Sequence, residues 1–171
     1  VRMFGRGYRM RSPKNIIDEM EMIHNKYGAN QFTFYDDAFT VDRKRVMNFC
    51  KELQVRKLNL IWDCGTRVDM VDRELLKTMH KSGCIAVWLG VESGNEIILG
   101  AMNKGLKLNQ TRLAYKIAHE VGLMTIANVV IGFPGETEQT ARQTINFVKE
   151  LNPDDVGFYV ATPYPGTPLY E

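Results

Sequence analysis

Residues that could bind a polar ligand follow directly after five apolar runs in the sequence. They form the segments Tyr35-Asp36-Asp37, Asp63 with Arg67, residues 90–94 (Gly-Val-Glu-Ser-Gly), residues 132–136 (Gly-Phe-Pro-Gly-Glu) and residues 162–166 (Thr-Pro-Tyr-Pro-Gly). A carboxylate accepts hydrogen bonds from ribose hydroxyls or an ammonium group, and an arginine can bind a carboxylate through two parallel hydrogen bonds. These residue types favour a pocket for a zwitterionic or ribose-bearing ligand, and an amino-acid nucleoside carries all of these groups.

Each segment also has a structural interpretation. Asp36 and Asp37 can be loop residues that hydrogen-bond their own backbone, and Arg67 can pair with Asp63 or Asp69. The glycines of residues 132–136 can serve a tight turn as well as let a backbone approach a ligand. Glu92 is the residue for which we most favour a role in binding, because an apolar run anchors its backbone while its side chain meets the end of the strand.

Ordinary catalytic groups are scarce at these positions. No serine or cysteine nucleophile stands there beside a histidine base. The three histidines, His24, His80 and His119, fall in expected helices, and we assign them no catalytic role.

A repeated strand–helix unit positions these segments. The pattern predicts strands at residues 31–35, 58–63, 85–91, 125–131 and 156–161, and five helices that begin after Ser12, Asp42, Asp72 and Thr137 or at Asn109. Gly28, Gly83 and Gly122 are expected to end three of them. The predicted core-facing residues of three helices are Ile16, Met20, Ile23 and Tyr27; Leu113, Ile117 and Val121; and Ala141, Ile145 and Val148.

Strands that are apolar on both faces and joined by helices indicate a parallel sheet, whose ligand sites lie at the carboxyl ends of the strands. A barrel and an open doubly wound sheet both fit this order. No Gly-x-Gly-x-x-Gly segment stands between a strand and a helix, which argues against a dinucleotide-binding sheet.

The composition limits the classes of binding partner that we expect. The 22 basic and 20 acidic residues leave a net charge of +2. We therefore expect a small-molecule substrate rather than nucleic acid or a membrane as the main partner. No apolar run approaches the roughly 20 residues of a membrane span. Cys50, Cys64 and Cys84 are widely separated in apolar segments, which predicts free buried thiols and a cytoplasmic protein rather than a metal site.

Seven segments in order resemble the radical SAM superfamily, in particular the branch that pairs this core with a cobalamin-binding domain and includes anaerobic magnesium-protoporphyrin monomethyl ester cyclases. Methylthiotransferases share similar segments. The resemblance covers essentially the whole chain and rests on residues 5–13 (GRGYRMRSP), 34–40 (FYDDAFT), 66–69 (TRVD), 90–94 (GVESG), 103–105 (NKG), 132–137 (GFPGET) and 162–167 (TPYPGT).

The resemblance implies an incomplete parallel (β/α) barrel over residues 1–171, with five strands and five helices and without the first strand of the family. In that family a Cys-x-x-x-Cys-x-x-Cys loop after the first strand holds a 4Fe–4S cluster, upstream of the basic loop at residues 2–14. The three cysteines here do not match that loop. We therefore expect this chain alone to bind no cluster and to be inactive. We also expect it to self-associate through an exposed barrel edge.

The resemblance also implies roles for single residues. Tyr35, Asp36 and Asp37 would bind the amino group of S-adenosylmethionine, Arg67 its carboxylate, and Glu92 with Ser93 its ribose or methionyl polar atoms. Adenine would be approached by Ile131, Gly132 and Phe133, and Thr162 and Pro163 would complete its wall or that of the substrate.

The implied activity of the intact enzyme is reductive cleavage of S-adenosylmethionine at the cluster, for radical oxidation, cyclisation or methylation of a substrate such as a tetrapyrrole. Cobalamin is an implied further cofactor. The alternatives are a methylthiotransferase-like enzyme, a non-catalytic ligand-binding barrel, and a lyase or aldolase that would need a lysine such as Lys104 beside a strand end.

Overall fold

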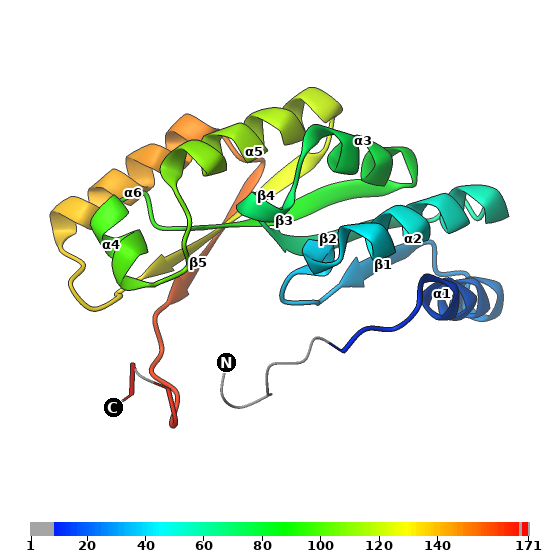
Figure 1. The fold of residues 1–171 in the computed structure, drawn as a ribbon, viewed down its shortest axis with the longest axis horizontal. Coiled ribbons are helices and arrows are strands. Elements are labelled where there is room, and N and C mark those ends of the chain that lie inside the picture. The colour runs from blue at the N-terminus through cyan, green and yellow to red at the C-terminus, as the bar shows by residue number, and fades with distance from the viewer. Residues whose placement is uncertain (1–8, 168, 171) are drawn as a thin grey trace.

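The computed structural model describes residues 9–167, 169 and 170, so part of the basic loop at residues 2–14 lies outside the described residues. Within them, five parallel strands pair in chain order: β1 (Gln31–Phe34), β2 (Ile61–Arg67), β3 (Cys84–Glu92), β4 (Met124–Ile131) and β5 (Asp155–Val160). The strand order never reverses, which excludes the doubly wound alternative. The strands form the curved half-barrel of Figure 1, as predicted.

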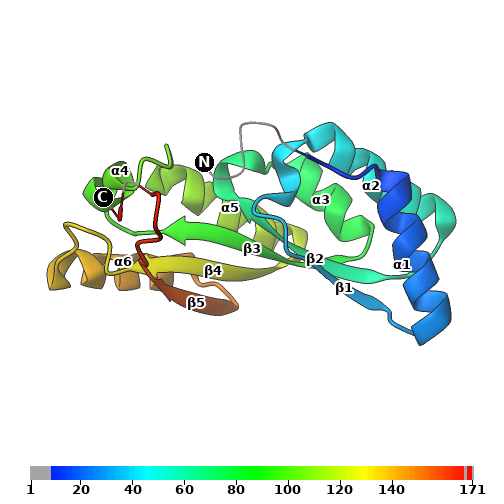
Figure 2. The same ribbon diagram turned by 90° about the horizontal axis from the view of Figure 1, so that it is seen from below.

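Helices cover the outer face of this sheet. They are α1 (Pro13–Tyr27), α2 (Arg43–Arg56), α3 (Arg73–Lys81), α4 (Glu96–Ala101), α5 (Leu108–Val121) and α6 (Glu138–Leu151). Along the sheet α1 contacts α2, α2 contacts α3, α3 contacts α5, and α5 contacts α6. Figure 2 shows the sheet from its edge, with α2 and α3 on one side of it. This row leaves the inner face of the sheet free to carry a site.

The short helix α4 was not predicted, so the described residues form one α-helix more than expected, besides short 3₁₀ helices at Phe39–Val41 and Val68–Met70. Its N-cap is Asn95, whose side chain accepts hydrogen bonds from the backbone N–H groups of Ile97 and Ile98. Only Ile98 and Leu99 are buried in it, and two apolar positions in six residues give too short a pattern to distinguish a helix from a loop.

The predicted helix starts are largely confirmed. Ser12, Asp42, Asp72 and Thr137 each accept a hydrogen bond from a backbone N–H of the first turn. Helix α5 begins one residue before the predicted Asn109. Gly28 and Gly122 end α1 and α5 in the left-handed conformation, as expected.

The end of α3 differs from the prediction. Its last residue is Lys81, with Ser82 as the C-cap, and Gly83 belongs to the turn that follows. Gly83 has φ +98°, and a Cβ there would lie 2.1 Å from the carbonyl oxygen of Leu60. The glycine is therefore needed for close approach of the backbone to the start of β2.

Three residues predicted to face the core are exposed: Tyr27 (68%), Leu113 (57%) and Ile145 (43%). In α5 and α6 the predicted Ile117 and Val148 are buried as expected, but Ala114 and Thr144 are buried in place of their neighbours Leu113 and Ile145. Tyr27 is the last residue of α1, where the helix extends past the residues that cover it. A buried threonine such as Thr144 carries no apolar signal, so the sequence favoured the neighbouring Ile145.

Strand β2 lies further along the chain than predicted, at Ile61–Arg67 rather than residues 58–63. Its second half contains Asp63 and Thr66, which are buried although they are polar. Arg67 therefore stands at the strand end, whereas Asp63 lies in the middle of the strand. This shift decides which of the two can reach the site.

The three cysteines are free and buried, as predicted. None of the helices in the described part of the chain has the length and apolarity that a membrane crossing requires.

Candidate functional site

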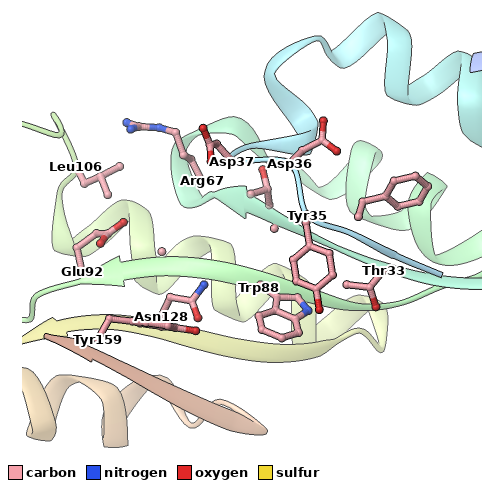
Figure 3. Close-up of a pocket in the computed structure, with 14 residues that line it drawn as sticks. Thr33, Tyr35, Asp36, Asp37, Arg67, Trp88, Glu92, Leu106, Asn128 and Tyr159 are labelled. Atoms are coloured by element: carbon pink, nitrogen blue, oxygen red, sulfur yellow. The ribbon is translucent and has the colours of Figure 1, made fainter. Parts of the chain in front are cut away.

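A cavity of about 290 Å³ opens at the carboxyl ends of the strands, near the lower limit of typical small-molecule pockets, which is about 300 Å³. All five strands or their following loops contribute to its wall (Figure 3). The lining residues are Thr33, Phe34, Tyr35, Asp36, Asp37, Gly65, Thr66, Arg67, Trp88, Gly90, Glu92, Leu106, Asn128 and Tyr159.

Five of the predicted site residues meet in this cavity: Tyr35, Asp36, Asp37, Arg67 and Glu92. They come from the ends of β1, β2 and β3, which are neighbours in the sheet. Parallel strands end at one edge, so segments far apart in the chain converge there. In Figure 3 the two aspartates and Arg67 lie on one side of the cavity, with Trp88 and Asn128 on the other.

Arg67 is held in place by Asp69. Its Nε and one terminal nitrogen donate to the two carboxylate oxygens at 2.9 and 2.8 Å, and that terminal nitrogen also donates to the carbonyl oxygen of Lys104 at 2.8 Å. The hydrogen bond from Arg67 lowers the pKa of Asp69, and the same bond raises the pKa of Arg67. The pairing considered as an alternative is therefore present, and it orients a guanidinium that still lines the cavity.

Glu92 adopts a conformation that its residue type rarely takes. Its φ is +65°, at an irregularity where the register between β3 and β4 shifts. The carboxylate folds back over Gly90, where a Cβ would lie 2.6 Å from Oε1 of Glu92. Lys104 Nζ lies 2.6 Å from the same oxygen. Left-handed non-glycine residues at pocket walls commonly reflect a functional constraint.

Ser93 lies apart from the cavity. It is fully buried and its hydroxyl hydrogen-bonds the Thr144 hydroxyl at 3.1 Å, while Gly94 N donates to the same threonine oxygen at 3.0 Å. A Cβ at Gly94 would lie 2.7 Å from Cα of Thr144. Ser93 therefore connects the turn after β3 to α6 through hydrogen bonds to Thr144.

The five remaining predicted residues are not part of the cavity wall. Ile131, Gly132 and Phe133 follow the end of β4, where Gly132 N donates to Glu136 Oε2 at 2.6 Å. Thr162 and Pro163 are exposed after β5. Their proposed contact with adenine stays a prediction.

Sequence reasoning missed most of the inner wall. Counting back two residues from a strand-end residue reaches the same face of the strand. From Tyr35 this step finds Thr33, from Arg67 it finds Gly65, and from Glu92 it finds Gly90. Asn128 and Tyr159 had no such starting point, because no predicted residue on β4 or β5 lines the cavity.

The cysteines do not fit an iron–sulfur cluster. Burial raises the pKa of Cys50 to about 12, and burial also raises that of Cys84, so both stay protonated thiols rather than metal-binding thiolates. Among the residues that the structure describes, no group of three or more His, Cys, Asp or Glu side chains could hold a metal ion.

Comparison with known proteins agrees with this geometry. The family model described as the radical SAM superfamily matches residues 2–148. An uncharacterized methyltransferase of Pyrococcus horikoshii is 36% identical over 168 residues, which cover 98% of this chain and 37% of that protein. The anaerobic magnesium-protoporphyrin IX monomethyl ester cyclase of Rubrivivax gelatinosus is 32% identical over 170 residues, which cover 98% of this chain and 31% of that protein.

Solved structures share the fold. The radical S-adenosylmethionine methyltransferase TsrM of Kitasatospora setae, solved with cobalamin and a 4Fe–4S cluster bound, superposes with a TM-score of 0.85 at 21% identity over 94% of this chain and 31% of that one. This chain thus spans about a third of the length of such proteins. The matching family model over most of its length shows that the chain belongs to the radical SAM superfamily.

Proposed function

We propose that these residues form the S-adenosylmethionine-binding part of a radical SAM enzyme. The observation that carries this proposal is the meeting of Asp36, Asp37, Arg67 and Glu92 around one cavity, in a chain of this superfamily. Their charges complement those of an amino acid joined to a nucleoside. The cavity holds both signs of charge and an aromatic wall, which suits a zwitterion with a ring.

In this proposal the charged groups orient the ligand. Asp36 and Asp37, after β1, accept hydrogen bonds from the ammonium group. Arg67, steadied by Asp69, donates to the carboxylate. Glu92 accepts from ribose hydroxyls, and its ion pair with Lys104 holds the carboxylate over Gly90. Ile131, Gly132, Phe133, Thr162 and Pro163 end or follow β4 and β5, and in this proposal they extend the wall toward adenine.

The 4Fe–4S cluster, when bound, would supply the electron that cleaves S-adenosylmethionine. The ligands of that cluster must come from outside these 171 residues, since the cysteines here do not fit one. We therefore propose that the 171-residue chain alone neither binds a cluster nor cleaves S-adenosylmethionine, which iron analysis after anaerobic reconstitution checks. Any cobalamin would likewise bind elsewhere in the whole protein.

The reaction of the whole protein is proposed from its relatives. One relative above 30% identity is called a methyltransferase and another a cyclase that acts on a magnesium porphyrin ester. Methyl transfer or radical cyclisation of a small molecule, including a tetrapyrrole, is therefore the proposed reaction. The free buried thiols suit a reducing compartment, so we propose that the protein is cytoplasmic.

Calorimetric titration of the whole protein with S-adenosylhomocysteine, a stable analogue, tests the binding role of Glu92. Glu92→Gln keeps the shape but removes the charge, and we expect a loss of about tenfold or more in affinity, since a hydrogen bond to a charged group contributes about 1.5–3 kcal/mol. Glu138→Gln is the matched control, because Glu138 is an exposed helix residue paired with Arg142. Equal affinity of Glu92→Gln and wild type would remove Glu92 from the site.

A further inference from the structure

The residues assigned above leave one charged part of S-adenosylmethionine without a partner, its positively charged sulfonium. The sulfur joins the amino-acid part, assigned to the ends of β1 and β2, to the ribose, assigned to Glu92 at the end of β3. It therefore lies between these strand ends, over the wall of the cavity. We propose that the ring of Trp88 binds the sulfonium and that Asp63 holds this ring in place. The inference rests on the proposed function, because it needs S-adenosylmethionine in this cavity.

Trp88 stands in the cavity wall between the two assigned ends of the ligand. In the sheet register it pairs with Gly65, which lies two residues before Arg67 on the same face of β2, and it lies four residues before Glu92 on the same face of β3. Gly65 has no side chain that could separate the ring from the end of β2. In Figure 3 the Trp88 ring lies across the cavity from Arg67. The ring is therefore a large side chain facing the path that joins Arg67 to Glu92.

Hydrogen bonds across three strands fix the orientation of this ring. The indole N–H of Trp88 donates to Oδ1 of Asp63 at 3.0 Å, and the Thr33 hydroxyl donates to Oδ2 of the same carboxylate at 2.9 Å. Thr33 and Asp63 are paired in the register of β1 and β2, and Asp63 is only 6% exposed. The N–H edge of the indole is thus engaged with a buried carboxylate, and the rest of the ring is what remains for a ligand.

These contacts favour a cation over a neutral group. The face of an aromatic ring attracts cations, and tryptophan does so most strongly among the aromatic side chains. A hydrogen bond from the indole N–H to a carboxylate polarises the ring further, because hydrogen-bonded groups polarise one another in the protein interior. The two groups that donate to Asp63, an indole and a hydroxyl, are uncharged, so they add no positive charge that would repel a sulfonium.

The test compares three ligands of the whole protein by calorimetry, without a reductant. S-adenosylmethionine carries the charged sulfonium, S-adenosylhomocysteine is the neutral thioether, and sinefungin carries an ammonium group in place of the methylated sulfur. Wild type should bind both charged ligands at least about fivefold more tightly than the thioether. Trp88→Leu should reduce this preference to about twofold or less. Tyr27→Leu, an exposed aromatic at the end of α1 and outside the cavity wall, should leave it unchanged.

Two variants of Asp63 test its role as a positioning residue. Asp63→Leu removes the acceptor of the Trp88 N–H, so the ring is no longer held, and the preference for the charged ligands should fall by about threefold or more. Asp63→Asn keeps an amide oxygen for the indole N–H and should restore most of the preference. Leucine and asparagine are similar in size, so this rescue separates holding the ring from filling the space beneath it.

Three outcomes overturn the proposal: equal affinity of wild type for the charged ligands and the thioether, sinefungin binding like the thioether, or a Trp88→Leu protein that loses affinity for all three ligands by the same factor. If Trp88→Leu does not fold, Trp88→Phe replaces it, because phenylalanine attracts cations less strongly, and an unchanged preference there overturns the proposal too. If wild type binds none of the three ligands, the proposed function fails instead, so the two failures are distinct.

Discussion

The conformation of Glu92 depends on the absence of a side chain two residues earlier. The Glu92 carboxylate occupies the space above Gly90 and meets Lys104 there. A left-handed backbone at φ +65° directs it that way. In the Gly-Val-Glu-Ser-Gly segment, Gly90 therefore leaves space for the Glu92 carboxylate, and the hydrogen bond of Ser93 to Thr144 fixes the turn that follows.

Gly90→Ala tests this dependence. Its methyl group would lie 2.6 Å from Oε1 of Glu92, so the carboxylate must move from its position over residue 90. We expect at least about a tenfold loss of S-adenosylhomocysteine affinity in the whole protein. The displaced atoms are the end of a flexible side chain, so the free energy of unfolding should change little.

The matched control is Gly100→Ala in α4, where an added Cβ meets nothing within 4 Å. Alanine is favoured over glycine in helices, so unfolding should become harder by up to about 1 kcal/mol and affinity should not change. Affinity is measured by calorimetry and stability by urea denaturation. A Gly90→Ala protein that binds as tightly as wild type would show that the folded-back position of Glu92 is dispensable.

At the scale of elements, the sequence predicted the alternation of strands and helices because each strand is an apolar run and most helices begin at a capping residue. The predicted position of β2 was wrong, because Asp63 and Thr66 are polar residues that are buried in the strand. Consequently Asp63 was expected at the strand end, whereas it lies inside the sheet under Trp88.

The cavity residues at the ends of β1, β2 and β3 could be predicted because the ends of parallel strands lie at one edge of the sheet. The cavity residues on β4 and β5 could not be predicted in this way. Asn128 is a single polar residue within an apolar strand, and Tyr159 looks like an ordinary strand aromatic. Their direction depends on strand register, which the sequence does not state. The burial of Ser93 depends on α6, an element about fifty residues later in the chain.

Helix α6 supports the site through Thr144. Its hydroxyl hydrogen-bonds both Ser93 and the backbone N–H of Gly94, directly after Glu92. Thr144→Val keeps the shape and removes the hydroxyl, so the Gly94 N–H loses its partner and the Ser93 hydroxyl keeps only the hydrogen bond from the Asn95 N–H. We expect a loss of about 1–3 kcal/mol in unfolding free energy and a weaker affinity for S-adenosylhomocysteine.

Thr144→Ser restores the hydroxyl and should recover the affinity, which is measured by calorimetry beside the valine variant. Thr78→Val is the control, because Thr78 hydrogen-bonds only the backbone of its own helix, at Glu74. If Thr144→Val lost stability but kept full affinity, α6 would support the fold without positioning Glu92.

At the scale of the whole molecule, the half-barrel has two ends. Within the described residues β1 pairs only with β2, and β5 pairs only with β4, as Figure 1 shows. Self-association through such an edge stays a prediction. The chain spans about a third of the length of its relatives. The proposed chemistry therefore belongs to the whole protein, and the proposed S-adenosylmethionine-binding residues belong to this chain.

The central claim is that S-adenosylmethionine binds across the ends of β1, β2 and β3. An experimental structure of the whole protein with S-adenosylmethionine bound tests it most directly. We expect the ligand's ammonium group beside Asp36 or Asp37, its carboxylate within hydrogen-bond distance of Arg67, and its ribose hydroxyls at Glu92. A ligand bound elsewhere, with these four side chains contacting only protein or water, would contradict the account.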